Sequence, residues 1–151
     1  MIEAVVRAAF DNSSHGEAGI VAEVRTEGRA LVEMVAETGG RIVGHILFSR
    51  MRCVPDRFVA GLGPLAVSPA HQSTGIGSTL SRAGIDACRA LGAEAIVVLG
   101  HPPYYPRFGF SAEAARQVAS PFAGSPAFMA MALKDGALDA PIKVDYPAAF
   151  G

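Results

Sequence analysis

The sequence predicts a single α/β domain, residues 1–151, whose central sheet holds both antiparallel and parallel strands. A Gly-Gly pair at 39–40 separates two apolar segments, which is typical of an antiparallel hairpin. Between 62 and 99 an apolar segment, a helical pattern and a second apolar segment follow one another, and such a unit joins parallel strands by a right-handed crossover. Half of the 151 residues are hydrophobic, which is enough for one sizeable core.

Two helices are expected before the hairpin. The first covers residues 2–10, where apolar side chains recur at helical spacing, and it ends at an Asp-Asn-Ser-Ser segment. The second covers residues 16–28 and ends at Gly28. The first strand of the sheet is therefore expected only from residue 31 onward.

The hairpin joins expected strands at 31–38 and 41–54. If the turn is tight and the register unbroken, Met34 lies opposite His45 and the two side chains share one face of the sheet. Glu33 would then point to the other face, so a Glu33–His45 pair is not expected. His45 is interpreted as a packed or hydrogen-bonded residue of the sheet.

The strand–helix–strand unit follows a connection at residues 55–61. Its first strand is the apolar segment 62–67, and its helix runs from about Gly75 to Leu91, with Gly92 suited to the left-handed C′ position. The continuous apolar run that follows Glu94 as far as Leu99 is typical of a strand covered on both faces.

The last third of the chain is less regular. Prolines and glycines in 111–125 favour a loop, residues 127–133 form a strand pattern, and residues 142–146 alternate apolar and polar side chains as an edge strand does.

A glycine loop, Gln72-Ser73-Thr74-Gly75-Ile76-Gly77, lies between the strand at 62–67 and its helix. A helix start exposes unpaired N–H groups and about half a positive charge, and glycines let a phosphate approach them closely. We therefore interpret the loop as an anion cradle, most simply for a pyrophosphate. A Walker A loop would need a lysine, and a dinucleotide fingerprint would need a glycine at Leu80. An ordinary glycine loop that caps a structural helix remains the alternative.

Composition excludes several partners. Lys+Arg 13 nearly balance Asp+Glu 14 without a basic cluster, so no nucleic-acid partner is expected. No apolar run approaches the ~20 residues of a membrane span, so no membrane partner is expected and the expected location is cytoplasmic. The two cysteines, Cys53 and Cys88, form no recognisable framework, Cys88 is expected to be buried, and no metal site is expected.

Two motifs in order resemble those of the Gcn5-related N-acetyltransferase (GNAT) family. The loop at 72–77, after a strand ending Leu65-Ala66-Val67, is similar to the segment with which that family holds acetyl-coenzyme A. Tyr105-Pro106-Arg107-Phe108-Gly109-Phe110 matches the family's Tyr-x-x-x-Gly-Phe. The resemblance covers nearly the whole chain. With Leu-Gly-Pro-Leu-Ala-Val at 62–67 and the closing Tyr146-Pro147-x-x-Phe150, it extends to the YhbS-like branch of the family.

The resemblance implies the acyl-coenzyme A N-acyltransferase fold, a mixed and mostly antiparallel central sheet with helices on both faces. The family's usual first strand is expected to be missing, or the chain shortened, because Met1 stands almost at the first helix. The implied activity is transfer of an acetyl group from acetyl-coenzyme A to an amine. The implied cofactor-binding residues are Leu65, Ala66 and Val67 for the pantetheine arm, and Gln72, Ser73, Thr74, Gly75, Ile76, Gly77 and Ser78 for the pyrophosphate.

The same resemblance makes Tyr105 the acid that protonates the departing thiolate, although an aromatic residue packed under the loop is the alternative. With ordinary values of about 10 for tyrosine and about 8.5 for a thiol, that proton transfer is uphill by about 2 kcal/mol. Many relatives carry a glutamate as base on the strand before the loop, whereas this chain has Gly61, Gly63 and Pro64 there. His101 is the best-placed candidate base, and a residue that orders the Pro-Pro turn is its alternative. Thr74 also stands where relatives often have Arg or Lys.

A site without a strong base favours a weakly basic amine, and the acceptor is expected to be a small-molecule or peptide amine. A non-catalytic acyl-coenzyme A-binding or sensing module is the second reading. A missing first strand would leave a sheet edge that could support a homodimer.

Overall fold

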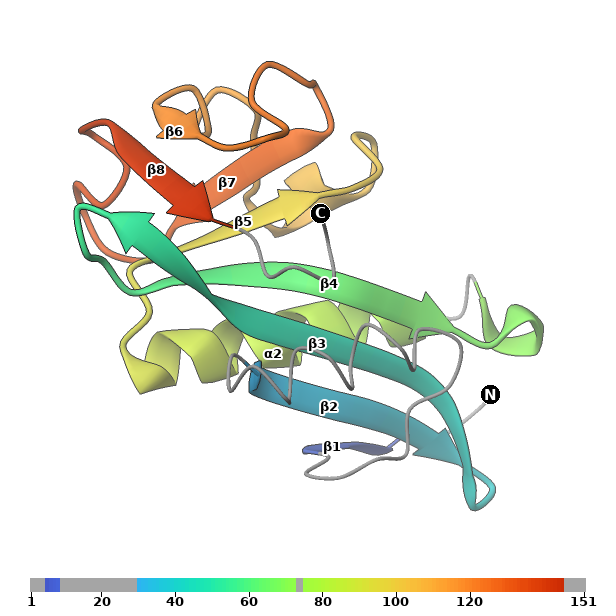
Figure 1. Ribbon diagram of the computed structural model, residues 1–151. Coiled ribbons are helices and arrows are strands. Elements are labelled where there is room, and N and C mark those ends of the chain that lie inside the picture. Colours follow the sequence, from blue (N-terminus) through green and yellow to red (C-terminus); the bar gives the residue numbers. More distant parts are fainter. Residues whose placement is uncertain (1–4, 9–29, 73–74, 146–151) are drawn as a thin grey trace.

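The computed structural model describes residues 5–8, 30–72 and 75–145, and its main feature is a twisted sheet in the order β1-β2-β3-β4-β5-β7 (Figure 1). Its neighbours are antiparallel except for the parallel pair β4–β5. Two short strands, β6 and β8, pair in parallel, and β8 also pairs with the C-terminal end of β3. The strands are β1 (Val5–Ala8), β2 (Ala30–Thr38), β3 (Arg41–Val54), β4 (Val59–Val67), β5 (Ala95–Leu99), β6 (Val118–Ala119), β7 (Phe128–Ala132) and β8 (Ile142–Asp145).

The N-terminal segment differs from the prediction, because Val5–Ala8 is a strand and not part of a helix. It pairs antiparallel with Met34 to Glu37 of β2. The first strand expected to be missing is therefore present. A run of nine residues is too short for periodicity to separate helix from strand, and its β-branched valines suit a sheet edge. The helix predicted at 16–28 lies outside the described residues, so within the described part α2 is the only α-helix.

The β2–β3 hairpin has the predicted tight turn, with Thr38 opposite Arg41, but its register then shifts by one residue. Val43 is an extra residue on β3, so Ala36 pairs with Gly44 and Val35 pairs with His45. A one-residue shift exchanges the two faces of a strand. The prediction that His45 shares a face with Met34 is therefore wrong, and His45 lies on the face of Glu33.

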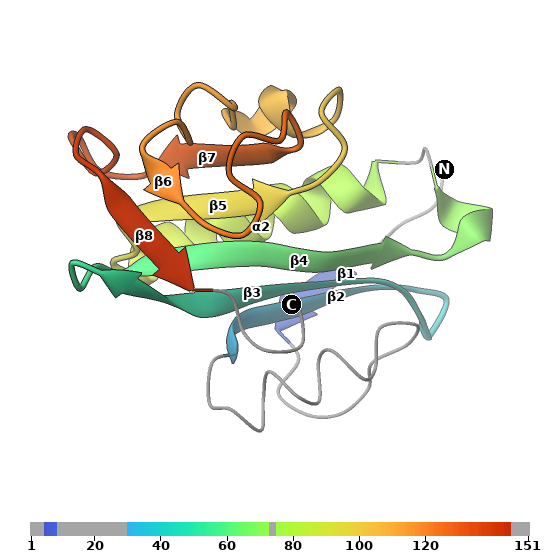
Figure 2. The same cartoon turned by 45° about the horizontal axis from the view of Figure 1, so that its top comes forward.

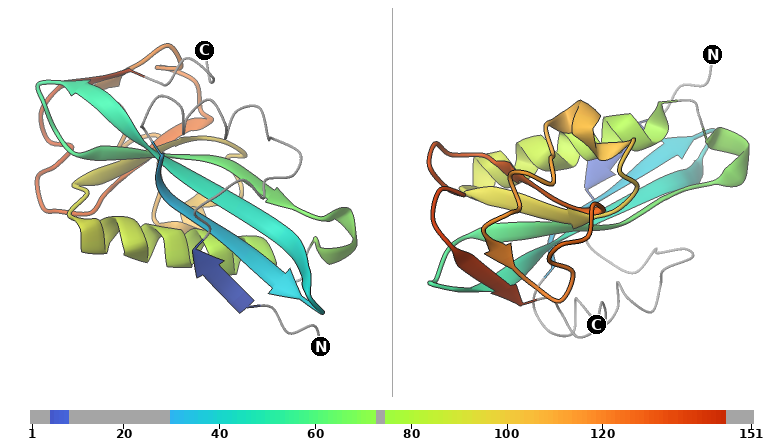
Figure 3. Two further views of the ribbon diagram at one scale, coloured as in Figure 1. Left: turned by 60° about the horizontal axis from the view of Figure 1, so that its bottom comes forward. Right: turned by 90° about the horizontal axis from the view of Figure 1, so that it is seen from above.

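The helix α2 (Ile76–Leu91) covers one face of the sheet, against β1 to β4 (Figures 2 and 3). Gly84 allows a close approach, since a Cβ there would lie 2.1 Å from the ring of Phe48 on β3. Gly92 ends the helix in the predicted left-handed conformation at φ 97°. Leu91, the last residue of the helix, is 54% exposed although it is apolar. The buried positions of the helix are Ile76, Leu80, Ser81, Gly84, Ile85 and Cys88.

A second apolar cluster fills the opposite face at the β5–β7 side of the sheet, where Val97 and Phe128 pack against Met51 and Val144. The strand β8 supplies Val144 and fits the strand predicted at 142–146, although it is paired on both sides and is not an edge. Side chains of β5 belong to both clusters, so this strand is packed on both of its faces.

The first part of β4, Val59 to Leu62, pairs with Ala95 to Val98 of β5, and the rest of β4 has no partner on that side among the described strands. Beyond Leu62 the two strands diverge, as Figure 1 shows. No described strand pairs with the β5-facing edge of β4 from Gly63 to Val67. A sheet that opens in this way exposes backbone N–H and C=O groups along one edge of β4.

Candidate functional site

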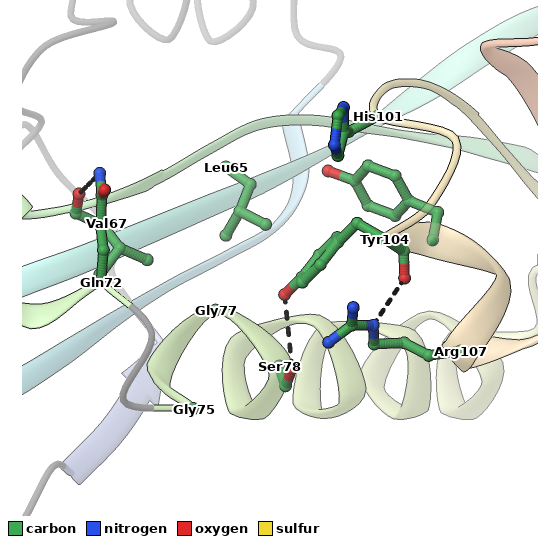
Figure 4. A pocket seen from close by; sticks show the side chains of 10 residues that line it. Leu65, Val67, Gln72, Gly75, Gly77, Ser78, His101, Tyr104 and Arg107 are labelled. Atoms are coloured by element: carbon green, nitrogen blue, oxygen red, sulfur yellow. Dashed lines mark hydrogen bonds between the residues drawn. The ribbon is translucent and has the colours of Figure 1, made fainter.

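A pocket of about 730 Å³ lies where the open edge of β4 meets the start of α2 (Figure 4). Leu65 and Val67 reach into it from β4, and the loop after β5 forms the opposite wall. Its described lining consists of Leu65, Val67, Gln72, Gly75, Gly77, Ser78, His101, Tyr104, Tyr105 and Arg107.

The N-terminus of α2 opens toward this pocket without a side-chain cap. Gly75 precedes the helix in a left-handed conformation at φ 88°, which glycine adopts without strain, and no acidic residue lies in the first turn. The first N–H groups of the helix therefore lack intrahelical partners and carry partial positive charge. The short 3₁₀ turn η1 (Pro69–His71) leads from β4 to this point, and the side-chain amide of Gln72 donates to the carbonyl of Val67 at 3.2 Å.

Gly77 lines the pocket between β4 and Tyr104. A Cβ at this position would stand 3.0 Å from the hydroxyl of Tyr104 and 3.6 Å from Val67 Cγ2. The Tyr104 hydroxyl also lies 3.5 Å from the hydroxyl of Ser78 (Figure 4). The missing side chain at position 77 thus keeps open the passage between β4, the helix start and Tyr104.

Four aromatic rings pack together around the 3₁₀ turn η2 (Tyr105–Phe108), and two of them, Tyr104 and Tyr105, line the far wall of the pocket. Tyr105 packs edge to face against Tyr104 at 5.1 Å and against Phe110 at 5.9 Å between ring centroids. Its ring also fills the space beside Gly100, where a Cβ would lie 2.3 Å from Tyr105 Cε2. Tyr105 is 8% exposed, and this burial, with a smaller effect of Tyr104, raises its pKa to about 12.

Arg107 and His101 are the basic side chains among the described lining residues. Arg107 donates from Nε to the carbonyl of Tyr104 at 2.8 Å and stacks over the Tyr104 ring, with Cζ 4.4 Å from its centroid. His101 is exposed and lines the same wall. None of the described lining residues is Asp or Glu.

Most of the predicted cofactor residues come together here. Leu65, Val67, Gln72, Gly75, Gly77 and Ser78 line the pocket, as do Tyr105 and His101. Ile76 instead packs in the core beneath it, and Ala66, paired with His45, faces the other side of the sheet. Ser73 and Thr74 lie outside the described residues. Sequence reasoning missed Tyr104 and Arg107, which the motif containing Tyr105 could have indicated.

On the face of the sheet away from α2, His45 Nε2 lies 2.5 Å from Glu33 Oε2. Both side chains are buried: 4% of the His45 side chain and 5% of the Glu33 side chain is exposed. This contact corrects the expectation that the two residues lie on opposite faces, and the extra residue Val43 is the cause. His45 Nδ1 is also buried and has no hydrogen-bond partner among the described residues.

The described residues contain no cluster of three or more metal-ligating side chains. Within residues 5–8, 30–72 and 75–145, no helix is long and apolar enough to span a membrane. Cys53 and Cys88 remain thiols, and Cys88 is buried as predicted.

Comparison with known proteins gives a consistent result. Residues 4–110 match the model of the acetyltransferase (GNAT) family. The chain is 32% identical over 141 residues to the uncharacterised N-acetyltransferase YhbS of Escherichia coli, an alignment that covers 91% of this chain and 83% of YhbS. It is 39% identical over 99 residues to the uncharacterised N-acetyltransferase YjhQ of Escherichia coli, covering 62% of this chain and only 55% of YjhQ.

Solved structures show the same fold. A crystal structure of Escherichia coli YhbS in complex with coenzyme A superposes with a TM-score of 0.83 at 26% identity, covering 96% of this chain and 91% of YhbS. A GNAT family acetyltransferase from Brucella melitensis in complex with acetyl-coenzyme A superposes with a TM-score of 0.79 at 28% identity, covering 99% of both chains. The predicted acyl-coenzyme A N-acyltransferase fold is thereby confirmed.

Proposed function

The chain belongs to the acetyltransferase (GNAT) family, and we propose that it transfers the acetyl group of acetyl-coenzyme A to an amine by direct attack. The observation that carries this proposal is the meeting, in one pocket, of the open edge of β4 and the uncapped start of α2. The open edge of β4 suits an extended chain that contains amides, and the uncapped start of α2 suits a phosphate group. The similar proteins crystallised with coenzyme A or acetyl-coenzyme A support the same ligand.

The edge of β4 would bind the pantetheine arm as an added strand. Its residues Gly63 to Val67 have no strand partner on the β5 side among the described residues, so their outward N–H and C=O groups can pair with the amides of the arm. An N–H of this segment would also donate to the thioester carbonyl as it becomes an oxyanion. One such donor is typically worth about 3–4 kcal/mol.

The first turn of α2 would hold the pyrophosphate. Gly75 and Gly77 leave their backbone N–H groups unshielded, and Ser78 adds a hydroxyl beside them. Arg107 is the described arginine of the pocket wall and supplies positive charge on the opposite side. Backbone donors therefore carry most of the binding, in keeping with Thr74 at the position where relatives often have Arg or Lys.

Tyr105 would protonate the departing thiolate. Its pKa of about 12 makes this transfer uphill by roughly 5 kcal/mol for a thiol near 8.5, instead of the ~2 kcal/mol expected from an ordinary tyrosine. A turnover near 10 per second corresponds to a barrier of about 16 kcal/mol, which leaves room for such a step. The raised pKa also keeps the hydroxyl protonated throughout the working pH range. His101, on the same pocket wall, is one candidate for the group that accepts the proton of the amine.

The acceptor would be a small-molecule or peptide amine. A lysine-type amine near pKa 10.4 needs about 4.6 kcal/mol to become neutral at pH 7, whereas an α-amine near 7.8 needs about 1 kcal/mol. Because none of the described lining residues is a carboxylate that could hold an ammonium, the pocket favours the less basic amines.

The test has two steps. Isothermal titration with acetyl-coenzyme A, and with ATP as a control nucleotide, should show binding of acetyl-coenzyme A alone. A thiol-release assay across α-amines, polyamines, lysine peptides and aromatic amines should then identify an acceptor. No binding at millimolar acetyl-coenzyme A would refute the proposal.

A second function, a non-catalytic acyl-coenzyme A-binding module, is favoured by the lack of a carboxylate among the described lining residues and by the raised pKa of Tyr105. It predicts tight binding of acetyl-coenzyme A without thiol release for any amine, and unchanged behaviour of Tyr105→Phe. If the protein is an enzyme, Tyr105→Phe should bind acetyl-coenzyme A with unchanged affinity and release thiol more slowly.

A further inference from the structure

Glu33 and His45 form a buried pair of ionisable side chains, which packing of the sheet does not need. Its two side chains project from β2 and β3 on the face away from α2, joined through Nε2 and Oε2 at 2.5 Å. Buried charged residues are rare and are commonly found where chemistry needs them. The pair is separated from the cofactor pocket by the thickness of the sheet, because Leu65 and Val67 face α2 whereas His45 does not.

The register places His45 beside the proposed reaction centre. His45 pairs with Ala66, the residue between Leu65 and Val67, and adjacent strands lie about 4.8 Å apart. Directly opposed residues share a face, so the row across the sheet reads Val35, His45, Ala66 and then the open edge of β4. If a thioester lies along that edge, as the proposed function requires, His45 is two strand spacings, about 10 Å, from it.

The inference depends on Nδ1 of His45, the ring nitrogen that does not contact Glu33. A carboxylate accepts a hydrogen bond from Nε2, and in a neutral imidazole this places the proton on Nε2 and leaves a lone pair on Nδ1. Nδ1 is buried without a partner among the described residues, and an unpaired buried polar atom in a folded protein calls for an explanation. A neutral imidazole held in this tautomer by a carboxylate is suited to accept a proton, because the carboxylate stabilises the imidazolium that results.

Among residues 5–8, 30–72 and 75–145, few other charged residues lie around His45. Glu37 lies further along the same face of β2, with an intermediate exposure, and the register places Arg7 of β1 opposite Val35. On β4 the neighbour is Ala66, which bears no charge. Glu33 is the group that contacts the ring directly.

We infer that the Glu33–His45 pair receives, through Nδ1 and a short chain of water molecules, the proton that the acceptor amine loses during acetyl transfer. The inference rests on the proposed function. The amine nitrogen attacks the carbonyl carbon, the C–N bond forms and the C–S bond breaks. The thiolate takes a proton from Tyr105, the amine gives its own to His45, and both residues return to their starting states through solvent. The products are the amide and the free thiol. His45 acts through water and is a positioning and relay residue.

This assignment competes with His101, which is exposed on the cofactor wall of the pocket. The leaving sulfur lies on that wall, near Tyr105, in the proposed arrangement. An amine that attacks from the other face of the sheet approaches the side on which His45 lies. The two histidines can be distinguished by parallel substitutions.

The experiment compares His45→Gln, Glu33→Gln and His101→Gln with a control variant, Leu47→Ala, in the full chain. Leu47 is fully buried two residues from His45 on the same face and carries no titratable group. Thiol release is measured with acetyl-coenzyme A and an accepted amine from about pH 6 to pH 10, and acetyl-coenzyme A binding is measured separately. We expect His45→Gln to lower kcat/KM by about 100-fold or more near pH 7, the usual contribution of a general base.

The shape of the pH profile separates a proton acceptor from a structural residue. The loss in His45→Gln should shrink toward pH 10, where the amine arrives neutral and hydroxide can take its proton, with affinity for acetyl-coenzyme A unchanged. Leu47→Ala should change activity by the same factor at every pH. A pH-independent loss in His45→Gln, or a pH-dependent loss only in His101→Gln, would overturn the inference and leave the proposed function standing.

A measurement on the unsubstituted protein tests the inference even where a variant fails to fold. Imidazole ¹⁵N chemical shifts should show the proton of His45 on Nε2 and a lone pair on Nδ1. A proton on Nδ1 would overturn the inference. If the unsubstituted protein binds acetyl-coenzyme A but acetylates no amine, the proposed function fails first, and the relay fails with it.

Discussion

The substitution Gly77→Ala should separate ligand binding from folding. An added Cβ would lie 3.0 Å from the Tyr104 hydroxyl and 3.6 Å from Val67 Cγ2, in the passage that the ligand is proposed to occupy. The hydroxyl is the end of a side chain and can move by a few tenths of an ångström. Alanine is the better helix former by about 1 kcal/mol, so the free energy of unfolding should stay equal or rise slightly. The methyl group should weaken acetyl-coenzyme A binding at least about tenfold, or ~1.4 kcal/mol.

The matched control is Gly84→Ala, two turns further along the same helix. Its Cβ would lie 2.1 Å from the Phe48 ring, and overpacking of a core contact typically destabilises by about 1–3 kcal/mol. Gly84→Ala should therefore unfold at lower urea concentration yet bind acetyl-coenzyme A normally, the reverse of Gly77→Ala. Isothermal titration and urea unfolding of both variants give the comparison. Unchanged acetyl-coenzyme A affinity in folded Gly77→Ala would refute the placement of the pyrophosphate at this helix start.

Two other predictions concern the buried hydroxyl and thiol. Tyr105→Phe keeps the ring contacts and should lower kcat by about 10²-fold or more with no change in acetyl-coenzyme A affinity; an unchanged kcat in the thiol-release assay would exclude the acid role. Burial raises the pKa of both Cys88 and Tyr105 to about 12, from 9.0 and 10.0. The folded protein then holds protons that the unfolded chain releases, so stability is full below about pH 9 and falls as the pH rises toward 12. At pH 10 the combined loss is roughly 2 kcal/mol, of which Cys88 accounts for about 1.4. Urea unfolding at pH 7 and 10 should show a smaller loss in Cys88→Ala, and an equal loss would contradict the assignment to this thiol.

The elements that the sequence predicted correctly are those whose signals are local. β3 has the predicted bounds Arg41–Val54, and α2 differs from prediction by one residue at its start. A Gly-Gly turn and a helix bounded by Gly75 and Gly92 depend only on neighbouring residues. The sequence also singled out the glycine loop and the aromatic motif around Tyr105 as candidate site segments. They meet in one pocket because the parallel β4–β5 crossover brings both strand ends to the same edge.

The elements that the sequence missed depend on pairing with distant residues. Val5–Ala8 became a strand because β2 offered an edge, and nothing within nine residues could show that. The bulge at Val43 follows a correctly predicted turn, and its cause lies outside the hairpin. The carbonyl of Val43 accepts the N–H of Ser68 at 2.7 Å, a contact with the end of β4 that no reading of the hairpin alone could reveal.

Packing against α2 explains why the shifted register is the stable one. In the observed register Gly44 faces the helix, and even a Cβ there would lie 2.9 Å from Leu80 and 3.0 Å from Ile76. An unshifted strand would turn His45 toward these two apolar side chains, where an imidazole finds no hydrogen-bond partner. The bulge instead gives the tight position to the glycine and brings the histidine to Glu33. Close packing of α2 and formation of the buried pair are thus two results of one extra residue, and the pair lies beside the segment of β4 that the proposed reaction uses.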